Sequence, residues 1–402
     1  MKILMLGWEL PPHNAGGLGV ACAHMCRALA SQGADIDFIV PYINSHPDID
    51  FMRVIPAIPA DAREVMKHSG AYDSFYYQSK TGKKHEIAAN DYHSIYEASV
   101  DRIVTLGEYD VIHAYDWLTI RPALRAKQLL GIPLIVNIHA LEYDRSGGGY
   151  GNPFVRDIEY HGMMMADKVV AISQHVKNII VREYHVPESK VEVIHNSHVI
   201  SGLNNQIAGP NTYRYIEMMR SVGYGIVMFF GRLTIQKNLP GLLRVMQKVV
   251  EKHPKSMLVL MGSGEQELEL VELAAELGIG GNVIFVGFQR GKEWRDMFGV
   301  SDICVMPSVS EPFGLTPLEA AEFGVPNLIS RQSGVAEILS SALRSDYWDV
   351  DDMANQIVSV LQNKELATQL SEDGISEVSK MNWDNNASKF LNLYRNQLGY
   401  AA

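Results

Sequence analysis

The sequence predicts an α/β protein that contains two doubly wound, parallel-sheet domains in tandem. Short apolar runs alternate with helical patterns along the whole chain, which is typical of parallel sheets covered by helices. The 402 residues are enough for two domains of ordinary size, each with its own core. A stretch rich in Asn, Gly and Ser over residues 197–225 divides the apolar runs into two sets and is the expected linker.

The apolar runs predict the strands of each domain. In the first half these are Lys2–Leu6, Ile36–Val40, Val111–Ala114, Leu134–Ile138, Lys168–Ile172 and Val191–Ile194. In the second half they are Ile226–Phe230, Met257–Met261, Val283–Val286, Ile303–Met306 and Asn327–Ser330. We therefore expect an N-terminal domain over 1–200, a C-terminal domain over 201–382, and a final amphipathic helix over 383–402 that packs back on the first domain. Ligands of such folds bind beyond the carboxyl ends of the strands, so two facing domains would hold a ligand in the cleft between them.

Composition narrows the class of protein. With 47% hydrophobic and 20% charged residues the chain has a globular composition, and it contains no window as long and apolar as a membrane span. Charged, Gly and Pro residues follow the first apolar residues almost at once, so no signal peptide is expected and the protein should be cytoplasmic. The net charge of −11 is shared almost evenly by the two halves, which argues against nucleic-acid binding. Cys22, Cys26 and Cys304 lie in apolar patterns and are interpreted as core residues, without a metal site.

A glycine-rich turn follows the first predicted strand. The sequence Trp8–Gly19 ends in Gly16-Gly17-Leu18-Gly19 and precedes a helix expected from about Val20 to Ser31. Glycines at a strand-to-helix turn let backbone amides approach an anion closely. The spacing is not that of the dinucleotide-binding fingerprint, and a flexible turn without a ligand is the alternative.

A pair of cations follows the first strand of the second domain. Arg232 and Lys237 lie five residues apart across a turn, so both can point to the top of the sheet, where a diphosphate would need them. Two solvated surface cations are the alternative interpretation.

The stretch SVSEPFGLTPLEAAEFGVP, residues 308–326, contains two glutamates in an apolar setting. Thr316-Pro317-Leu318-Glu319 has the form of a capping box, with Thr316 as N-cap and Glu319 reaching back to a backbone amide. Capping explains Glu319 without a ligand, but it does not explain Glu311. Because Gly314 leaves nearby amides uncovered, the stretch predicts a second anion site, with Glu311 accepting hydrogen bonds from hydroxyls.

Polar residues also follow strands of the first domain. His113 and His139 stand at predicted strand ends, and Tyr115-Asp116-Trp117 and the loop Glu142–Gly149 emerge at the same sheet edge as the glycine-rich turn. A structural role is the alternative for either histidine.

Together these motifs resemble those of one enzyme family. They are the Gly16–Gly19 turn, DVIHAYDW at 110–117, IHALEYDRSGG at 138–148, KVEVIHNS at 190–197, FFGRLTIQKN at 229–238, LMGSGEQ at 260–266, and the two glutamates Glu311 and Glu319. In this order and spacing they resemble the retaining family 4 glycosyltransferases, which include glycogen and starch synthases. The resemblance covers nearly the whole chain and implies the GT-B fold, with two Rossmann-like domains facing across a cleft.

The resemblance also implies a role for each matching residue. Arg232 and Lys237 would hold the diphosphate of a sugar nucleotide, Glu311 would bind the hydroxyls of the sugar, and His139 would lie near its C6 hydroxyl; these four are the implied catalytic residues. Glu319 would bind the ribose. The implied donor-binding residues are Gly16, Gly17, Phe288, Gln289, Phe313, Gly314, Leu315, Thr316 and Glu319, with Phe288 and Gln289 against the base. The acceptor-side candidates are Asp116, Glu142, Tyr143, Asp144 and Arg145.

The implied reaction moves a glucose- or mannose-type hexose from a UDP-, ADP- or GDP-sugar to a carbohydrate or lipid-linked acceptor, by a front-face mechanism, without metal or other cofactor. A lipid-linked acceptor would place the protein peripherally at the inner membrane face. The alternatives are a glycogen or starch synthase proper and a non-catalytic sugar-nucleotide-binding protein. Two departures bear on them: Asn14-Ala15 stands where bacterial glycogen synthases carry a lysine, and Ser197-His198-Val199 replaces the common Gly-Val-Asp.

Overall fold

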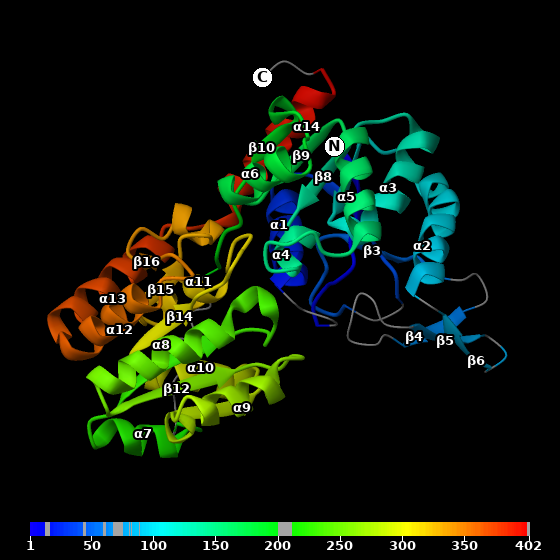
Figure 1. The fold of residues 1–402 in the computed structure, drawn as a ribbon. Coiled ribbons are helices and arrows are strands. Elements are labelled where there is room, and N and C mark those ends of the chain that lie inside the picture. The colour runs from blue at the N-terminus through cyan, green and yellow to red at the C-terminus, as the bar shows by residue number, and fades with distance from the viewer. Residues whose placement is uncertain are drawn as a thin grey trace. The chain divides into compact units, whose positions relative to one another are not determined.

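The structure is a computed structural model with two compact units (Figure 1). It describes residues 1–12, 17–42, 46–58, 62–66, 75–79, 81, 83–87, 89–199 and 211–399. Unit 1 comprises Met1–Glu142, Asn152–Ser197 and Asn382–Ala402, and unit 2 comprises Tyr143–Gly151 and His198–Met381. The predicted boundary at residue 200 lies outside the described residues.

Unit 1 is built on a seven-stranded parallel sheet whose central strands are almost completely buried. In sheet order the strands are β10 (Val191–Val193), β9 (Lys168–Ala171), β8 (Leu134–Ile138), β7 (Val111–Tyr115), β1 (Lys2–Leu6), β2 (Asp35–Val40) and β3 (Arg53–Pro56). Because these strands are buried on both faces, their sequences are continuous apolar runs.

The helices of unit 1 bury their apolar sides around this sheet. They are α1 (Gly17–Ser31), α2 (Ala89–Ile103), α3 (Trp117–Leu130), α5 (Pro153–Met165), α6 (Gln174–Glu183) and α14 (Trp383–Gln397). The short helix α4 (Glu142–Arg145) starts in unit 1 with Glu142, and its other three residues belong to unit 2. The side chain of Asn382 caps α14 by accepting a hydrogen bond from the amide of Asn385. α14 packs against α1, and the hydroxyl of Tyr394 lies 2.5 Å from Nδ1 of the buried His113. His113 therefore has a structural contact in the interior of β7, two residues before the strand ends.

The segment between β3 and α2 forms a separate three-stranded antiparallel sheet. It contains β4 (Ala62–Met66), β5 (Phe75–Ser79) and β6 (Lys84–Ile87), and none of these strands was predicted.

Unit 2 has a six-stranded parallel sheet with a hydrophobic core on each face. In sheet order its strands are β13 (Val283–Gly287), β12 (Ser256–Met261), β11 (Gly225–Phe230), β14 (Ile303–Met306), β15 (Asn327–Ser330) and β16 (Leu343–Ser345). Alternate residues of β11 point to opposite faces: Val227 and Phe229 enter one core, and Ile226 and Met228 enter the other. The helices are α7 (Arg214–Ser221), α8 (Leu239–Lys252), α9 (Glu267–Glu276), α10 (Gly291–Val300), α11 (Thr316–Glu322), α12 (Val350–Gln362) and α13 (Lys364–Val378).

The order of strands reverses once in each sheet. In unit 1 the chain builds outward in opposite directions from β1 and β7, and in unit 2 it does so from β11 and β14. Ligands of doubly wound sheets bind at this reversal, beyond the carboxyl ends of the two strands. The loops after β1, β7, β11 and β14 are therefore the first places to look for a site.

The predicted strands are confirmed to within one or two residues, and the predicted α/β class is confirmed. Cys22, Cys26 and Cys304 are free and buried, as predicted. No helix among the described residues combines the length and hydrophobicity that crossing a bilayer requires.

Candidate active site

In unit 2 the two loops at the strand reversal carry the predicted cations and glutamates. The loop after β11 contains Arg232 and a short 3₁₀ helix (Ile235–Lys237), and the loop after β14 contains Glu311 and leads into α11. Lys237 and Glu311 form an ion pair, and their side chains are only 15% and 9% exposed. The structure thus brings together two predicted catalytic residues that are 74 positions apart.

The carboxylate of Glu311 uses its two oxygens differently. Oε2 accepts hydrogen bonds from Lys237 and from the hydroxyl of Ser308, the latter at 3.0 Å. Oε1 receives no hydrogen bond from any residue in the described part of the chain. One oxygen is anchored, and the other can accept a hydrogen bond from a ligand.

Backbone contacts on both sides hold the Glu311 loop. Gln236 donates from Nε2 to the carbonyl of Ser310 and accepts from the amide of Val309, both at 2.9 Å. On the other side, the carbonyl of Glu311 accepts from the amide of Gly334 at 2.9 Å. A loop fixed at this many points presents its carboxylate in a preorganised position.

Two glycines allow the loop after β12 to pack directly on the loop after β11. A Cβ on Gly262 would lie 1.8 Å from the carbonyl oxygen of Gly231, and one on Gly264 would lie 2.3 Å from that of Leu233. Gly262 also has a φ of +149°. The motif LMGSGEQ therefore supports the backbone that carries Arg232 and Lys237, a role that the sequence did not reveal.

The predicted capping box at α11 does not form. Leu315, not Thr316, is the N-cap, with helical φ and ψ of −76° and −33° and no side-chain cap. The amides of Leu318 and Glu319 both donate to the carbonyl of Leu315, so Thr316 is already the first helical residue. The extended backbone that lets an N-cap side chain reach N3 is absent at this turn of the described chain.

Glu319 is consequently available for another role. Its half-buried carboxylate receives no hydrogen bond from the described residues, and burial, followed by the charge of Glu322, raises its pKa to about 7. The amides of Gly314, Leu315 and Thr316 likewise donate to no described residue. Gly314 has a φ of +97°, and a Cβ there would lie 2.7 Å from Met306 Cε. The turn thus offers uncommitted amide donors beside an uncommitted carboxylate.

The remaining donor-side residues of unit 2 lie on loops that follow its strands. Arg232 is exposed and pairs with no carboxylate of the described residues. Phe288 and Gln289 follow β13, and Phe288 is 55% exposed with the guanidinium of Arg290 5.0 Å from its ring centre. Phe313 is buried and serves as part of the loop's packing, with its carbonyl accepting from the amide of Val335.

In unit 1 the loops after β7 and β8 are joined through Asp116. Its Oδ1 accepts hydrogen bonds from the amides of His139 at 2.6 Å and Ala140 at 3.3 Å. Asp116 adopts a φ of +56°, an uncommon value for a non-glycine residue. Burial lowers the pKa of the half-buried His139 to about 3, so its imidazole is neutral near pH 7. Gly17 begins α1, whereas Gly16 lies outside the described residues.

The acceptor-side candidates on the loop 142–151 separate into two groups. Glu142 is buried in unit 1, where its Oε1 accepts from the amide of Asn152 at 2.8 Å and so joins the two ends of the loop. Tyr143, Asp144 and Arg145 belong to unit 2, although they were predicted in the first domain. The hydroxyl of Ser310 donates to Asp144 Oδ1 at 2.5 Å, next to Glu311.

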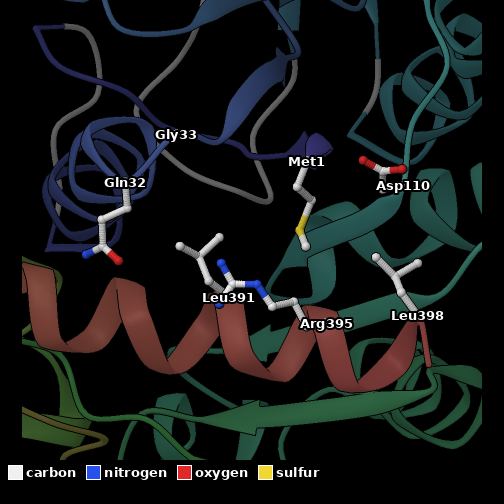
Figure 2. Close-up of a pocket in the computed structure, with 7 residues that line it drawn as sticks. All are labelled: Met1, Gln32, Gly33, Asp110, Leu391, Arg395 and Leu398. Carbon is white, nitrogen blue, oxygen red and sulfur yellow. The ribbon is translucent and has the colours of Figure 1, made fainter. Parts of the chain in front are cut away.

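A cavity of about 350 Å³ lies elsewhere, at the opposite edge of the sheet of unit 1 (Figure 2). Met1, Gly33 and Asp110, which line it, stand before the amino ends of β1, β2 and β7, and Leu391 and Arg395 of α14 line it from the other side. It is therefore distinct from the loops at the carboxyl ends of the strands.

Comparisons with known proteins agree with these features. Residues 15–198 match the sequence profile described as Glycosyltransferase Family 4, and residues 220–377 match the profile described as Glycosyl transferases group 1. The chain belongs to the family 4 glycosyltransferases. An uncharacterized glycosyltransferase of Methanocaldococcus jannaschii is 29% identical to it, with 98% of each chain covered.

Two further comparisons concern a sequence relative and a solved structure with a similar fold. A glycogen synthase of Mycobacterium tuberculosis is 26% identical, with 90% of this chain and 86% of the relative covered. The crystal structure of Anabaena HepE in complex with UDP and glucose superposes with a TM-score of 0.73 at 15% identity, covering 98% of this chain and 100% of that one. The predicted GT-B fold and the predicted family are both confirmed.

Proposed function

We propose that this glycosyltransferase retains the anomeric configuration while it moves a glucose- or mannose-type hexose from a nucleoside diphosphate sugar to a hydroxyl acceptor, without a metal ion. The observation that carries the proposal is the Lys237–Glu311 pair at the strand reversal of unit 2. It combines a cation for a departing diphosphate with a carboxylate oxygen, Oε1, that is open to sugar hydroxyls.

In this proposal the donor's diphosphate is bound by Arg232, Lys237 and the amides of Gly314–Thr316. When the bond from the anomeric carbon to the diphosphate breaks, positive charge grows on the sugar and negative charge grows on the phosphate. Fixed cations and amide dipoles aimed at that phosphate lower the barrier, because they need no reorganisation as the charge develops. Glu319 accepts hydrogen bonds from the ribose hydroxyls, and Phe288 and Gln289 lie against the base.

The front-face mechanism follows from which groups can move a proton. The neutral His139 is suited to hydrogen bonding with a sugar hydroxyl, because its lowered pKa of about 3 makes it a poor proton acceptor near pH 7. Glu311 Oε2 is already occupied by Lys237 and Ser308. We therefore assign the acceptor's proton to the departing phosphate oxygen: the acceptor oxygen bonds to the anomeric carbon on the face that the diphosphate leaves.

The nucleotide and the acceptor are assigned by class. Anabaena HepE, which has a similar fold, binds UDP and glucose in its crystal structure, so UDP is the first nucleotide to test, with ADP and GDP as alternatives. The acceptor is a carbohydrate or lipid-linked hydroxyl, and Asp116, Tyr143, Asp144 and Arg145 are its candidate contacts. Glu142, the fifth predicted acceptor-side residue, has a structural contact at the base of the loop and is therefore the weakest candidate of the five.

The direct test is to incubate the purified chain with UDP-, ADP- and GDP-hexoses and an acceptor panel that includes glycogen and lipid-linked sugars. We expect nucleotide release with one donor and, by NMR, a product with the donor's anomeric configuration. Glu311→Gln should reduce release at least tenfold, whereas Glu372→Gln, an exposed glutamate on α13, should not. An inverted product, or release that Glu311→Gln leaves unchanged, would contradict the proposal.

The same panel separates the two alternatives. Glycogen as the preferred acceptor would support a glycogen synthase proper, the activity named for the Mycobacterium tuberculosis relative. Tight binding of a sugar nucleotide without transfer to any acceptor or to water would support a non-catalytic binding protein.

A further inference from the structure

His198 and Glu322 form a largely buried pair within unit 2. His198 Nε2 lies 2.6 Å from Glu322 Oε2, and the two side chains are 10% and 3% exposed. His198 is the first residue of the unit 2 segment that follows Ser197 of unit 1. Glu322 is the last residue of α11, the helix that carries Glu319. The pair thus ties the start of the connection between the units to this helix.

The pair acts on Glu319 through the geometry of α11. Residues three positions apart on a helix lie on the same side, so the charge of Glu322 is felt by Glu319. This is the second cause, after burial, of the pKa of about 7 at Glu319. A histidine within hydrogen-bond distance compensates part of the charge of Glu322, either as a cation or by donating an N–H.

Burial and the charge of Glu322 are the two causes of the raised pKa of Glu319. Cys304 on β14 also interacts with Glu319, but burial raises the thiol's own pKa to about 12, so it stays neutral. α13 packs on α11 with Gly374 near Ala321, and β15 contacts it through Asn327 Nδ2, which donates to the carbonyl of Pro317. Neither contact brings a titratable side chain toward Glu319.

We propose that His198 and Glu322 are a positioning pair that sets the charge of Glu319 and thereby makes donor binding depend on pH near neutrality. This inference rests on the proposed function, because it needs Glu319 to bind the ribose. Neither residue touches the donor; both act through Glu319.

The direction of the effect follows from which form of Glu319 binds. Two ribose hydroxyls donate hydrogen bonds, so they favour the ionised carboxylate, which has acceptors only. As the pH falls through about 7, Glu319 takes up a proton and donor affinity should decrease, approaching tenfold per pH unit well below the midpoint. Above the midpoint the affinity should be constant.

The two members of the pair should shift this midpoint in opposite directions. His198→Leu removes both the possible charge and the N–H donor beside Glu322, so the charge of Glu322 is less compensated, the pKa of Glu319 rises and the midpoint moves to higher pH. Glu322→Gln removes the charge, which lowers the pKa and preserves affinity at lower pH. Because His198 acts only through Glu322, the double variant should behave like Glu322→Gln alone.

The experiment is isothermal titration calorimetry of UDP-glucose from pH 5.5 to 8.5 with the full chain. UDP-glucose is preferred to UDP, whose terminal phosphate itself titrates near pH 6. We expect the wild type to lose affinity below pH 7, Glu319→Gln to show no pH dependence, and the two single variants to show opposite shifts. ADP- and GDP-glucose replace the probe if UDP-glucose does not bind.

The outcomes separate the inference from the function beneath it. If His198→Leu and Glu322→Gln weaken binding equally at every pH, or shift the midpoint in the same direction, the pair is merely structural and the inference is wrong. If Glu319→Gln keeps both the affinity and the pH dependence of the wild type, the ribose role of Glu319 is wrong. If none of the three sugar nucleotides binds the wild type, the proposed function and the inference both fail.

Discussion

Replacing Lys237 by methionine tests whether the ion pair at the strand reversal supports the fold, the donor or both. Methionine keeps most of the side-chain volume but removes the ammonium group, so among the described residues the side chain of Glu311 keeps only the hydrogen bond from Ser308. The free energy of unfolding should fall by about 2 kcal/mol, the value of a charge-assisted hydrogen bond. The upper limit is about 3–5 kcal/mol, the cost of leaving a fully buried charge uncompensated.

The double variant Lys237→Met/Glu311→Gln separates the two roles. A neutral glutamine needs no cation, so the double variant should recover at least about 1 kcal/mol of the stability lost in Lys237→Met. It should not recover donor binding, because the diphosphate still lacks its cation. One lost charge-assisted contact of about 1.5–3 kcal/mol corresponds to roughly 10- to 150-fold weaker UDP binding.

The assay compares urea unfolding midpoints and UDP dissociation constants for the wild type, the two single variants and the double variant. Lys248→Met is the matched control, since its ion pair with Asp351 on the surface of unit 2 has exposed fractions of 38% and 69%. Breaking that exposed pair should change stability by less than about 1 kcal/mol and leave UDP binding unchanged. If Lys237→Met binds UDP as tightly as the wild type, the diphosphate does not contact Lys237 and the reasoning fails.

Three further results are expected. Gly262→Ala should destabilise unit 2 by several kcal/mol in urea unfolding, because the new Cβ would lie 1.8 Å from the carbonyl oxygen of Gly231. The control Gly281→Ala should cost little, because a Cβ there would meet nothing within 4 Å. Equal unfolding midpoints for the two variants would contradict the contact. Tyr394→Phe should lower the stability of unit 1 by about 1–3 kcal/mol in the same assay, because the buried ring of His113 loses its hydrogen bond with the Tyr394 hydroxyl. An unchanged unfolding midpoint would refute this. Turnover should persist in excess EDTA; strict metal dependence would contradict the roles given to the cations.

The sequence predicted the central strands accurately because they are buried on both faces. Such strands are continuous apolar runs, and little else in a chain of this composition looks like them. The strands missed from the two main sheets are β3 and β16, and each is an edge strand of its sheet. β3 has an exposed arginine at its start and a proline at its end, and β16 has only three residues with an arginine in the middle. Unlike the edge strands β10 and β13, these two strands therefore gave no apolar signal.

For the site, the sequence could propose the residues but not what holds them. Lys237 and Glu311 were found because their motifs occur in the order that the family resemblance requires. The contact between Ser310 and Asp144 joins residues 166 positions apart, and nothing in either motif indicates it. The order of motifs also placed Asp144 in the first domain, because position in the chain does not show which unit a loop packs against.

The failed capping box at α11 illustrates how a local pattern can hide a functional residue. Thr316 and Glu319 have the spacing of a cap, and a cap would have consumed one of the carboxylate's oxygens. The helix begins at Thr316, one residue earlier than predicted, with Leu315 as its N-cap, so that use is absent within the described turn. The carboxylate stays half-buried with a raised pKa. A protein gains no stability from such a group, so its retention needs another reason. The binding of ribose hydroxyls supplies such a reason in this proposal. It also explains why the two glutamates differ. The charge of Glu311, beside the proposed diphosphate, is compensated by Lys237, whereas Glu319 has no such cation among the described residues and responds to pH. In this proposal neither carboxylate is then free to act as the general base, so the acceptor's proton is assigned to the departing phosphate oxygen.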